Sequence, residues 1–180
     1  MTILEETGRN IVLLRTALGM TQEEAAFRSN LSVSRYQDIE RGCANTTLDS
    51  LARIARTFQV DSRVLGAFTR PDGEIISEIR NSSRYLLERP ESGLPIYENI
   101  VLLRRQRRLT QAQLARKSNI SPARLRDIEH GCANTTIRTL ACLANGVDMS
   151  LLGLALVTVT EDELWEIVRR ARDMAGIRIL

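Results

Sequence analysis

The side chains that most often perform catalysis are few and scattered in this chain. Its 180 residues include one histidine, His130, and three cysteines, Cys43, Cys132 and Cys142, none of them in a Cys-x-x-Cys pair. A single histidine leaves no multi-histidine metal site, and the sequence has neither a phosphate-cradling glycine loop nor a nucleophile elbow. We therefore expect no enzyme, no metal site and no cofactor. The odd number of thiols indicates a reduced protein.

Arginine is the residue whose chemistry the sequence favours. Lys117 is the only lysine among 25 basic side chains, and the planar guanidinium group suits bidentate recognition of phosphate and guanine. The net charge of +3 is too small to indicate nucleic acid by itself. Its distribution is more telling, because residues 1–89 are balanced, whereas residues 96–156 have nine basic and four acidic side chains.

The composition predicts a folded protein of the cytoplasm. Hydrophobic residues make up 43% of the chain and aromatic residues only 4%, so aliphatic side chains must fill the core, which favours helices. The first residues lack the basic region of a signal peptide, and the longest apolar run, residues 151–157, is too short to cross a membrane. We expect a cytoplasmic protein without a membrane partner.

An internal duplication organises the chain. The hexapeptide NIVLLR occurs at residues 10–15 and again at 99–104, and a shift of 89 residues aligns 10–55 with 99–144 at 25 identities in 46 positions. The best block pairs DIERGCANTT (38–47) with DIEHGCANTT (127–136). After Ala144 the alignment needs a two-residue gap that closes near Thr158. The sequence therefore predicts two units of about ninety residues each.

Apolar spacing and capping residues predict the same helices in both copies. In the first copy we expect helix 1 over about 9–18, helix 2 from the cap Thr21 in a capping box with Glu24, and helix 3 from the cap Ser32. Helix 4 follows Thr46 or Thr47, and a fifth helix covers about 61–68. The second copy repeats this order from Tyr97. A helix at 74–88 connects the copies, and a final helix runs from Thr160 to about Met174.

Two segments carry a family pattern: TQEEAAFRSNLSVSRYQDIERG (21–42) and TQAQLARKSNISPARLRDIEHG (110–131). Thr-Gln, an Ala four residues after the Gln, a turn, Ser, an apolar residue and Ile-x-x-Gly resemble the XRE, or Cro/phage-repressor, type of helix-turn-helix regulator. The resemblance implies an all-α fold with two tandem lambda-repressor-like helix-turn-helix domains of about five helices each, plus a connecting helix and a C-terminal helix. We expect the domains at 1–70 and 96–158, a connecting segment at 71–95 and the C-terminal helix at 159–180.

The resemblance also assigns roles to side chains. It implies two structural ion pairs, Arg15–Glu40 and Arg104–Glu129, and it places helix 3 of each copy in the major groove of DNA. Gln22 and Gln111 are expected at the DNA backbone, with a surface amide as the alternative. Contacts to bases or to the DNA backbone are also expected from helix 3 and from the loop that follows it. For the helix residues the alternative is a solvated surface charge, and for the loop asparagines it is the formation of a turn. The residues are Ser32, Ser34, Arg35, Gln37, Asp38 and Asn45 in the first copy, and Ser121, Arg124, Arg126, Asp127 and Asn134 in the second.

Buried and exposed positions of helix 3 behave differently between the copies. The buried positions agree, except that Tyr36 stands where the family has an aliphatic residue, so its hydroxyl must reach water or a partner. The exposed positions mostly differ, so we expect the two copies to bind different half-sites. The predicted function is a DNA-binding transcriptional regulator, a repressor, acting on double-stranded DNA as a homodimer without a small-molecule ligand. The alternative is a protein-binding module, such as an antitoxin, antirepressor or assembly factor, in which one or both domains no longer bind DNA.

Overall fold

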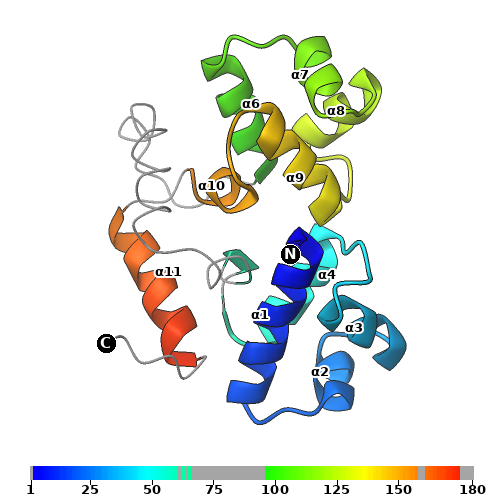
Figure 1. The fold of residues 1–180 in the computed structure, drawn as a ribbon, viewed down its shortest axis with the longest axis vertical. Coiled ribbons are helices and arrows are strands. Elements are labelled where there is room, and N and C mark those ends of the chain that lie inside the picture. The colour runs from blue at the N-terminus through cyan, green and yellow to red at the C-terminus, as the bar shows by residue number, and fades with distance from the viewer. Residues whose placement is uncertain (1, 61, 64, 66–95, 158–160, 175–180) are drawn as a thin grey trace. The chain divides into compact units, whose positions relative to one another are not determined.

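The computed structural model of the chain is built from helices (Figure 1), and it describes residues 2–60, 62, 63, 65, 96–157 and 161–174. The expected all-α fold is confirmed. The helix expected at 74–88 lies outside the described residues, as does most of the one expected at 61–68. The described helices are α1 (Ile3–Ala17), α2 (Gln22–Arg28), α3 (Val33–Glu40), α4 (Leu48–Thr57), α6 (Ile96–Gln106), α7 (Gln111–Lys117), α8 (Pro122–Glu129), α9 (Ile137–Gly146), α10 (Leu151–Leu156) and α11 (Glu161–Met174).

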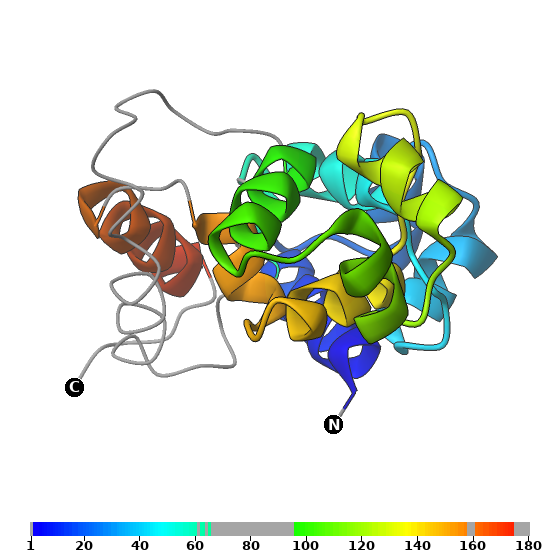
Figure 2. The same cartoon turned by 90° about the horizontal axis from the view of Figure 1, so that it is seen from above.

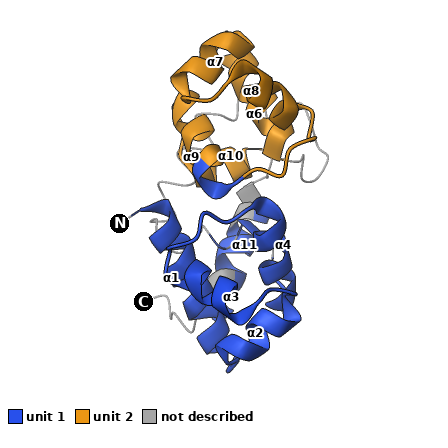
Figure 3. Ribbon diagram, turned by 90° about the vertical axis from the view of Figure 1, so that its right-hand side faces the viewer, with its two compact units in different colours: residues 1–70, 136–138, 162–180 blue, residues 71–135, 139–161 orange. Residues whose placement is uncertain are grey.

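The chain divides into two compact units (Figure 3). Unit 1 comprises residues 1–70, 136–138 and 162–180, and unit 2 comprises residues 71–135 and 139–161. In unit 1, α3 packs against α1 and α2, and α4 packs against α2. In unit 2, α8 packs against α6 and α7, and α10 packs against α6. Figure 2 shows this last pair, with α10 in orange beside α6 in green. We call residues 3–65 the first repeat and residues 96–157 the second repeat.

Helix α1 is longer than the sequence analysis predicted, because it begins at Ile3 and not near residue 9. The hydroxyl of Thr2 accepts a hydrogen bond from the backbone N of Glu5, and the Glu5 carboxylate accepts one from the backbone N of Thr2 at 2.7 Å. This capping box satisfies two backbone donors that would otherwise lack a partner at the start of the helix. The predicted start at residue 9 is therefore wrong.

The turn between the second and third helices has the geometry that its sequence predicts. Asn30 and its equivalent Asn119 have φ angles of 52° and 53°, in the left-handed region that asparagine tolerates better than most residues. Ser32 then caps α3, since its side chain accepts a hydrogen bond from the backbone N of Arg35. The turn therefore follows from local chemistry.

The structure decides one capping prediction and corrects another. Of the two residues expected to cap α4, Thr47 is the cap. The capping box expected at α2 is only half formed, because the Thr21 hydroxyl accepts from the backbone N of Glu24 while the Glu24 carboxylate pairs with Arg28 Nη2 at 2.5 Å. An oppositely charged residue one turn along the helix thus takes the carboxylate away from the cap.

The core of each repeat is aliphatic, with one exception. Ala26 and Ala115 are fully buried, and a small side chain suits a place where two helices pack together. Tyr36 is also fully buried, and its hydroxyl has no hydrogen-bond partner among the described residues. The hydroxyl therefore makes no hydrogen bond of ordinary geometry with the described residues, although the Glu40 carboxylate is close enough to raise its pKa. The equivalent residue is Leu125, so this site of the scaffold also suits an apolar side chain.

A buried asparagine ties the first helix of each repeat to a backbone carbonyl near the end of that repeat. Asn99 Nδ2 donates to the carbonyl oxygen of Leu154 at 2.9 Å, and Asn10 Nδ2 donates to that of Leu65. Both pairs are 55 residues apart, so the 89-residue register continues to Leu154. The gap that we expected after Ala144 is therefore wrong.

The C-terminal helix is present as α11 and ends at Met174, as expected. Nearly all of it belongs to unit 1. Its residues Ile167 and Val168 are buried, while Trp165 is 37% exposed. None of the described helices is long and apolar enough to cross a membrane.

Candidate nucleic-acid interface

Helices α3 and α8 each bury one face and expose the other. Tyr36 and Ile39 of α3, and Leu125 and Ile128 of α8, point into the core. The side chains predicted to contact DNA lie on the remaining surface, where all of them are exposed or half-buried. They are Ser32, Ser34, Arg35, Gln37 and Asp38 in the first repeat, and Ser121, Arg124, Arg126 and Asp127 in the second.

The buried carboxylate of Glu40 joins α1, α2 and α3. Arg15 Nε donates to its Oε1 at 2.6 Å, and Gln22 Nε2 donates to its Oε2 at 2.6 Å. Arg15 also donates from Nη1 to the carbonyl oxygen of Met20 at 2.8 Å. The hydrogen bond to Glu40 raises the pKa of Arg15 above its ordinary value, although burial acts in the opposite direction.

The second repeat builds the same cluster. Arg104 Nε and Nη2 donate to Glu129 Oε1 and Oε2 at 2.6 and 3.0 Å, and Gln111 Nε2 donates to Oε2 at 2.7 Å. Arg104 Nη1 donates to the carbonyl oxygen of Leu109 at 3.1 Å. The structure thus contains both ion pairs that the resemblance implied. It adds a glutamine to each, which the sequence reasoning missed.

This cluster fixes what the two glutamines can offer to DNA. One amide hydrogen is committed to the glutamate, so one remains to donate to a phosphate oxygen. In the first repeat the other end of the amide is also occupied, because Gln37 Nε2 donates to Gln22 Oε1 at 3.2 Å. In the second repeat Arg126 stands at the position of Gln37, and no described residue donates a hydrogen bond to Gln111 Oε1.

The exposed polar side chains of α3 are held by their own repeat. Besides the bond from Gln37, Arg35 Nη2 donates to the carbonyl oxygen of Asn45 at 3.3 Å. Arg41 Nη2 donates to Asp38 Oδ1 at 2.6 Å in an exposed ion pair. The three long polar side chains predicted to contact bases therefore all have an intramolecular partner.

The exposed polar side chains of α8 are arranged differently. Arg124, Arg126 and Asp127 are all exposed, and within the described ranges their side chains form no hydrogen bond or ion pair. His130 replaces Arg41, and its Nδ1 lies 2.7 Å from the carbonyl oxygen of Arg126 and not against the aspartate. Two guanidinium groups and one carboxylate are thus available to an external partner.

The remaining predicted residues lie at the ends of α3 and α8. The hydroxyls of Ser32 and Ser121 accept hydrogen bonds from the backbone N of Arg35 and Arg124 at 3.3 and 3.1 Å. Each serine is thus a helix cap that keeps its hydroxyl hydrogen for another acceptor. The loops that follow the two helices expose Asn45 and Asn134.

Nothing in the described part of the chain builds a metal site. No group of three or more His, Cys, Asp or Glu side chains in that part is arranged to hold an ion. The thiols of Cys43 and Cys132 are exposed, that of Cys142 is half-buried, and all three are free.

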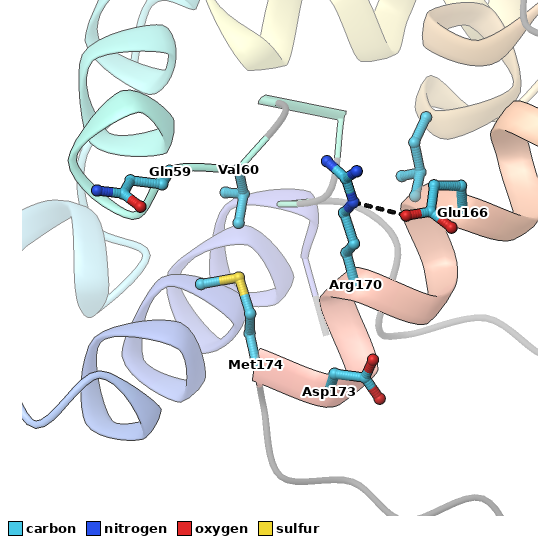
Figure 4. A pocket seen from close by; sticks show the side chains of 7 residues that line it. Gln59, Val60, Glu166, Arg170, Asp173 and Met174 are labelled. Carbon is cyan, nitrogen blue, oxygen red and sulfur yellow. Dashed lines mark hydrogen bonds and ion pairs between the residues drawn. The ribbon is translucent and has the colours of Figure 1, made fainter.

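A cavity of about 250 Å³ lies in unit 1 (Figure 4). It is lined by Gln59 and Val60, just after α4, and by residues of α11, where Arg170 Nε donates to Glu166 Oε1 at 2.7 Å. Met174, the last residue of α11, is among them. None of its lining residues belongs to α2 or α3, so the cavity is not part of the surface described above.

Comparison with known proteins supports the same organisation. A family model described as helix-turn-helix matches the chain twice, over residues 11–65 and 100–154. The two matches share the 89-residue offset and together cover more than half of the chain. Neither a curated protein nor a solved structure matches it.

Proposed function

Because the chain belongs to the helix-turn-helix family, with one match in each repeat, we propose that it is a sequence-specific DNA-binding regulator of transcription that places α3 and α8 in the major groove. The resemblance to the XRE type of helix-turn-helix protein is thereby confirmed at the level of the family. The proposal goes further, since it assigns the two helices a partner and a purpose.

The exposed face of α8 is the observation that supports this function most directly. Arg124 and Arg126 project from a helix whose opposite face is buried, and neither has a partner within the described residues. An arginine can donate two hydrogen bonds to guanine O6 and N7, which makes it the commonest specific contact in the major groove. A stabilising role inside the fold does not account for them.

The two helices offer different chemistry to a base pair. At equivalent positions α3 has Gln37 where α8 has Arg126, and Val33 where α8 has Pro122. Glutamine pairs best with adenine, arginine with guanine, and an apolar side chain with the methyl group of thymine. We therefore propose two unlike half-sites.

Selection of bound duplexes from a random DNA pool tests this function with the full chain. The expected result is two different motifs at a fixed spacing. Two identical motifs would refute the unlike half-sites, and the absence of binding at low salt would refute DNA binding as a whole. The exchange variants Arg126→Gln and Gln37→Arg make the test sharper. Each should change the preferred base at one position only, by about 1–3 kcal/mol of discrimination.

We also propose that the regulator represses by occupying its operator, in the cytoplasm and as a homodimer. The sequence favoured a homodimer because the apolar residues at 151–159 and 164–168 are more than one small core requires. Most of those that the structure describes are buried within the single chain, among them Leu154, Val157 and Ile167, so they support a dimer less than the sequence suggested. Sedimentation of the free protein tests the dimer. A reporter placed behind the selected site tests repression, which higher expression in the presence of the protein would refute.

One observation favours the alternative of a protein-binding role for the first repeat. Phe27 of α2 is 85% exposed, whereas the equivalent residue in α7 is Arg116. The variant Arg35→Ala/Gln37→Ala separates the two roles. If it binds the selected DNA with unchanged affinity and base preference, the first repeat does not read DNA and the protein-binding role is favoured.

A further inference from the structure

We propose that the two repeats divide the work of binding: the second repeat supplies nearly all of the attraction to phosphate, while the first contributes base preference with little electrostatic affinity. This inference rests on the proposed function, because it concerns how the same two surfaces hold DNA. It is carried by the placement of charge on a scaffold that is otherwise shared.

The charge difference is concentrated where α2, α3 and the following loop lie. We call residues 16–49 and their equivalents 105–138 the interface segments. The first interface segment has three basic and five acidic side chains, a net charge of −2. The second has eight basic and two acidic side chains, a net charge of +6. A net negative segment opposes the approach of phosphates, whereas a net positive one attracts them.

Outside the interface segments, the net charge changes in the opposite direction between the two repeats. Residues 50–65 have a net charge of +2, and their equivalents 139–154 have a net charge of −1. A general drift toward basic residues would have raised the charge everywhere. The second repeat instead gains eight charge units in its interface segment and loses three behind it, which matches a surface selected for a polyanion.

Acidic partners neutralise the exposed arginines of the first interface segment. Arg28 Nη2 lies 2.5 Å from Glu24 Oε1, and Arg41 Nη2 lies 2.6 Å from Asp38 Oδ1. Arg35, the remaining cation of this segment, donates to the carbonyl oxygen of Asn45. A guanidinium group that already has an acceptor must break this contact before it can bind a phosphate.

The second interface segment lacks these acidic partners. Gln113 stands where the first repeat has Glu24, and Arg138 stands where it has Asp49. Among the described residues, the only ion pair of the eight cations joins Lys117 Nζ to Asp148 Oδ2, at 3.8 Å. Arg107 Nε also donates to the carbonyl oxygen of Val147 at 3.2 Å. The side chains of the other six cations have no hydrogen bond or ion pair within the described ranges, so they can replace the counterions of DNA, which is the process that makes binding salt-dependent.

The test measures how the affinity of the full chain for its selected duplex depends on salt. Each phosphate that a basic side chain neutralises adds about 0.9 to the slope of log affinity against log salt. The variant Arg105→Thr/Arg108→Gly gives the second repeat the residues of the first at two exposed positions that are not assigned to base contacts. Its slope should fall by about 1.8, which shrinks the loss of affinity between 50 and 200 mM salt by about 12-fold.

The matched control removes the same number of cations from the first repeat. Arg28→Gln/Arg41→Gln should change the slope by less than about 0.5, since both side chains already have acidic partners. A gain-of-function variant, Glu24→Gln/Asp49→Arg, introduces the residues of the second repeat and should raise the slope by about 1–2. Circular dichroism of each variant confirms that it is folded.

The outcomes separate this inference from the proposed function. If the two cation-removal variants lower the slope equally, or if the gain-of-function variant leaves it unchanged, the division of work is refuted while DNA binding stands. If the unaltered chain binds neither the selected duplex nor a random duplex at low salt, the proposed function itself fails.

Discussion

The glutamate clusters give a prediction that can be worked from distances and burial. Glu40 accepts hydrogen bonds from Arg15 and Gln22. Its side chain is only 2% exposed, and that of Arg15 is 16% exposed. Replacing the carboxylate in Glu40→Leu leaves a guanidinium group in a site that is mostly closed to water. Breaking a buried pair in this way costs about 3–5 kcal/mol. Arg15 keeps its bond to the carbonyl oxygen of Met20, so the lower end, about 3 kcal/mol, is expected.

Urea unfolding followed by circular dichroism measures this cost. For a domain of this size about 3 kcal/mol corresponds to a fall in Tm of roughly 12–24 °C. Glu129→Leu should cost the same in the second repeat, because Arg104 and Glu129 are 12% and 4% exposed. Glu24→Leu is the matched control: it breaks an ion pair whose partners are 53% and 41% exposed, so it should cost less than about 1 kcal/mol.

A double variant shows whether the cost comes from an unpaired charge. Arg15→Met/Glu40→Leu removes both charges and should recover most of the lost stability, because an apolar pair replaces a buried ion pair at little net cost. If Glu40→Leu costs no more than Glu24→Leu, or if the double variant is no more stable than Glu40→Leu alone, the reasoning is wrong.

Three further predictions use the same unfolding assay. Tyr36→Phe should stabilise the chain by about 1 kcal/mol, because the hydroxyl it removes is buried without a partner. Burial, together with the charge of Glu40, raises the pKa of Tyr36, so the folded chain keeps this hydroxyl protonated. The stability that depends on the protonated tyrosine is fully present below pH 10.0 and is lost as the pH rises above that value, and Tyr36→Phe should not show this loss; an unchanged alkaline profile in the variant would contradict this. Ser118→Ala should stabilise the chain by about 1 kcal/mol, because the buried Ser118 hydroxyl has no partner among the described residues. The equivalent variant Ser29→Ala should destabilise it by a similar amount, because Ser29 Oγ lies 3.0 Å from Thr57 Oγ1; effects of equal sign would refute these two predictions. Asn99→Ala should cost about 2 kcal/mol by releasing α10 from α6, and a cost under about 0.5 kcal/mol would show that the bond contributes little.

Local chemistry explains which parts of the fold could be predicted from the sequence. The left-handed turn at Asn30 and the cap at Ser32 depend on neighbours within a few positions, so their roles follow from residue type and spacing. The capping box of Thr2 and Glu5 is equally local, and its Ser/Thr-x-x-Glu spacing was a signal that could have placed the start of α1.

The rest of the site depends on contacts between helices. Gln22 and Glu40 are 18 residues apart, and their hydrogen bond exists only because α2 and α3 pack together. The same is true of Asn99, whose acceptor lies 55 residues along the chain. A sequence shows that such side chains can donate, but the fold decides to which acceptor they are directed.

The Gln22 amide also bears on whether the first repeat still binds DNA. If the first repeat had lost that role, the ion pair of Arg15 and Glu40 would still be needed for stability, since its loss leaves a buried charge. Gln22 contributes less in that sense, because an apolar residue at its place would leave the ion pair intact and remove one donor from Glu40 Oε2, which keeps Arg15 Nη2 at 3.4 Å. Both repeats nevertheless have the glutamine, and both hold it by one amide hydrogen so that the second remains for a phosphate. The first repeat has therefore kept the polar group that positions a helix on DNA while its charge has become unfavourable for phosphate. This combination argues for a domain that reads bases once the second repeat has brought the chain to its site.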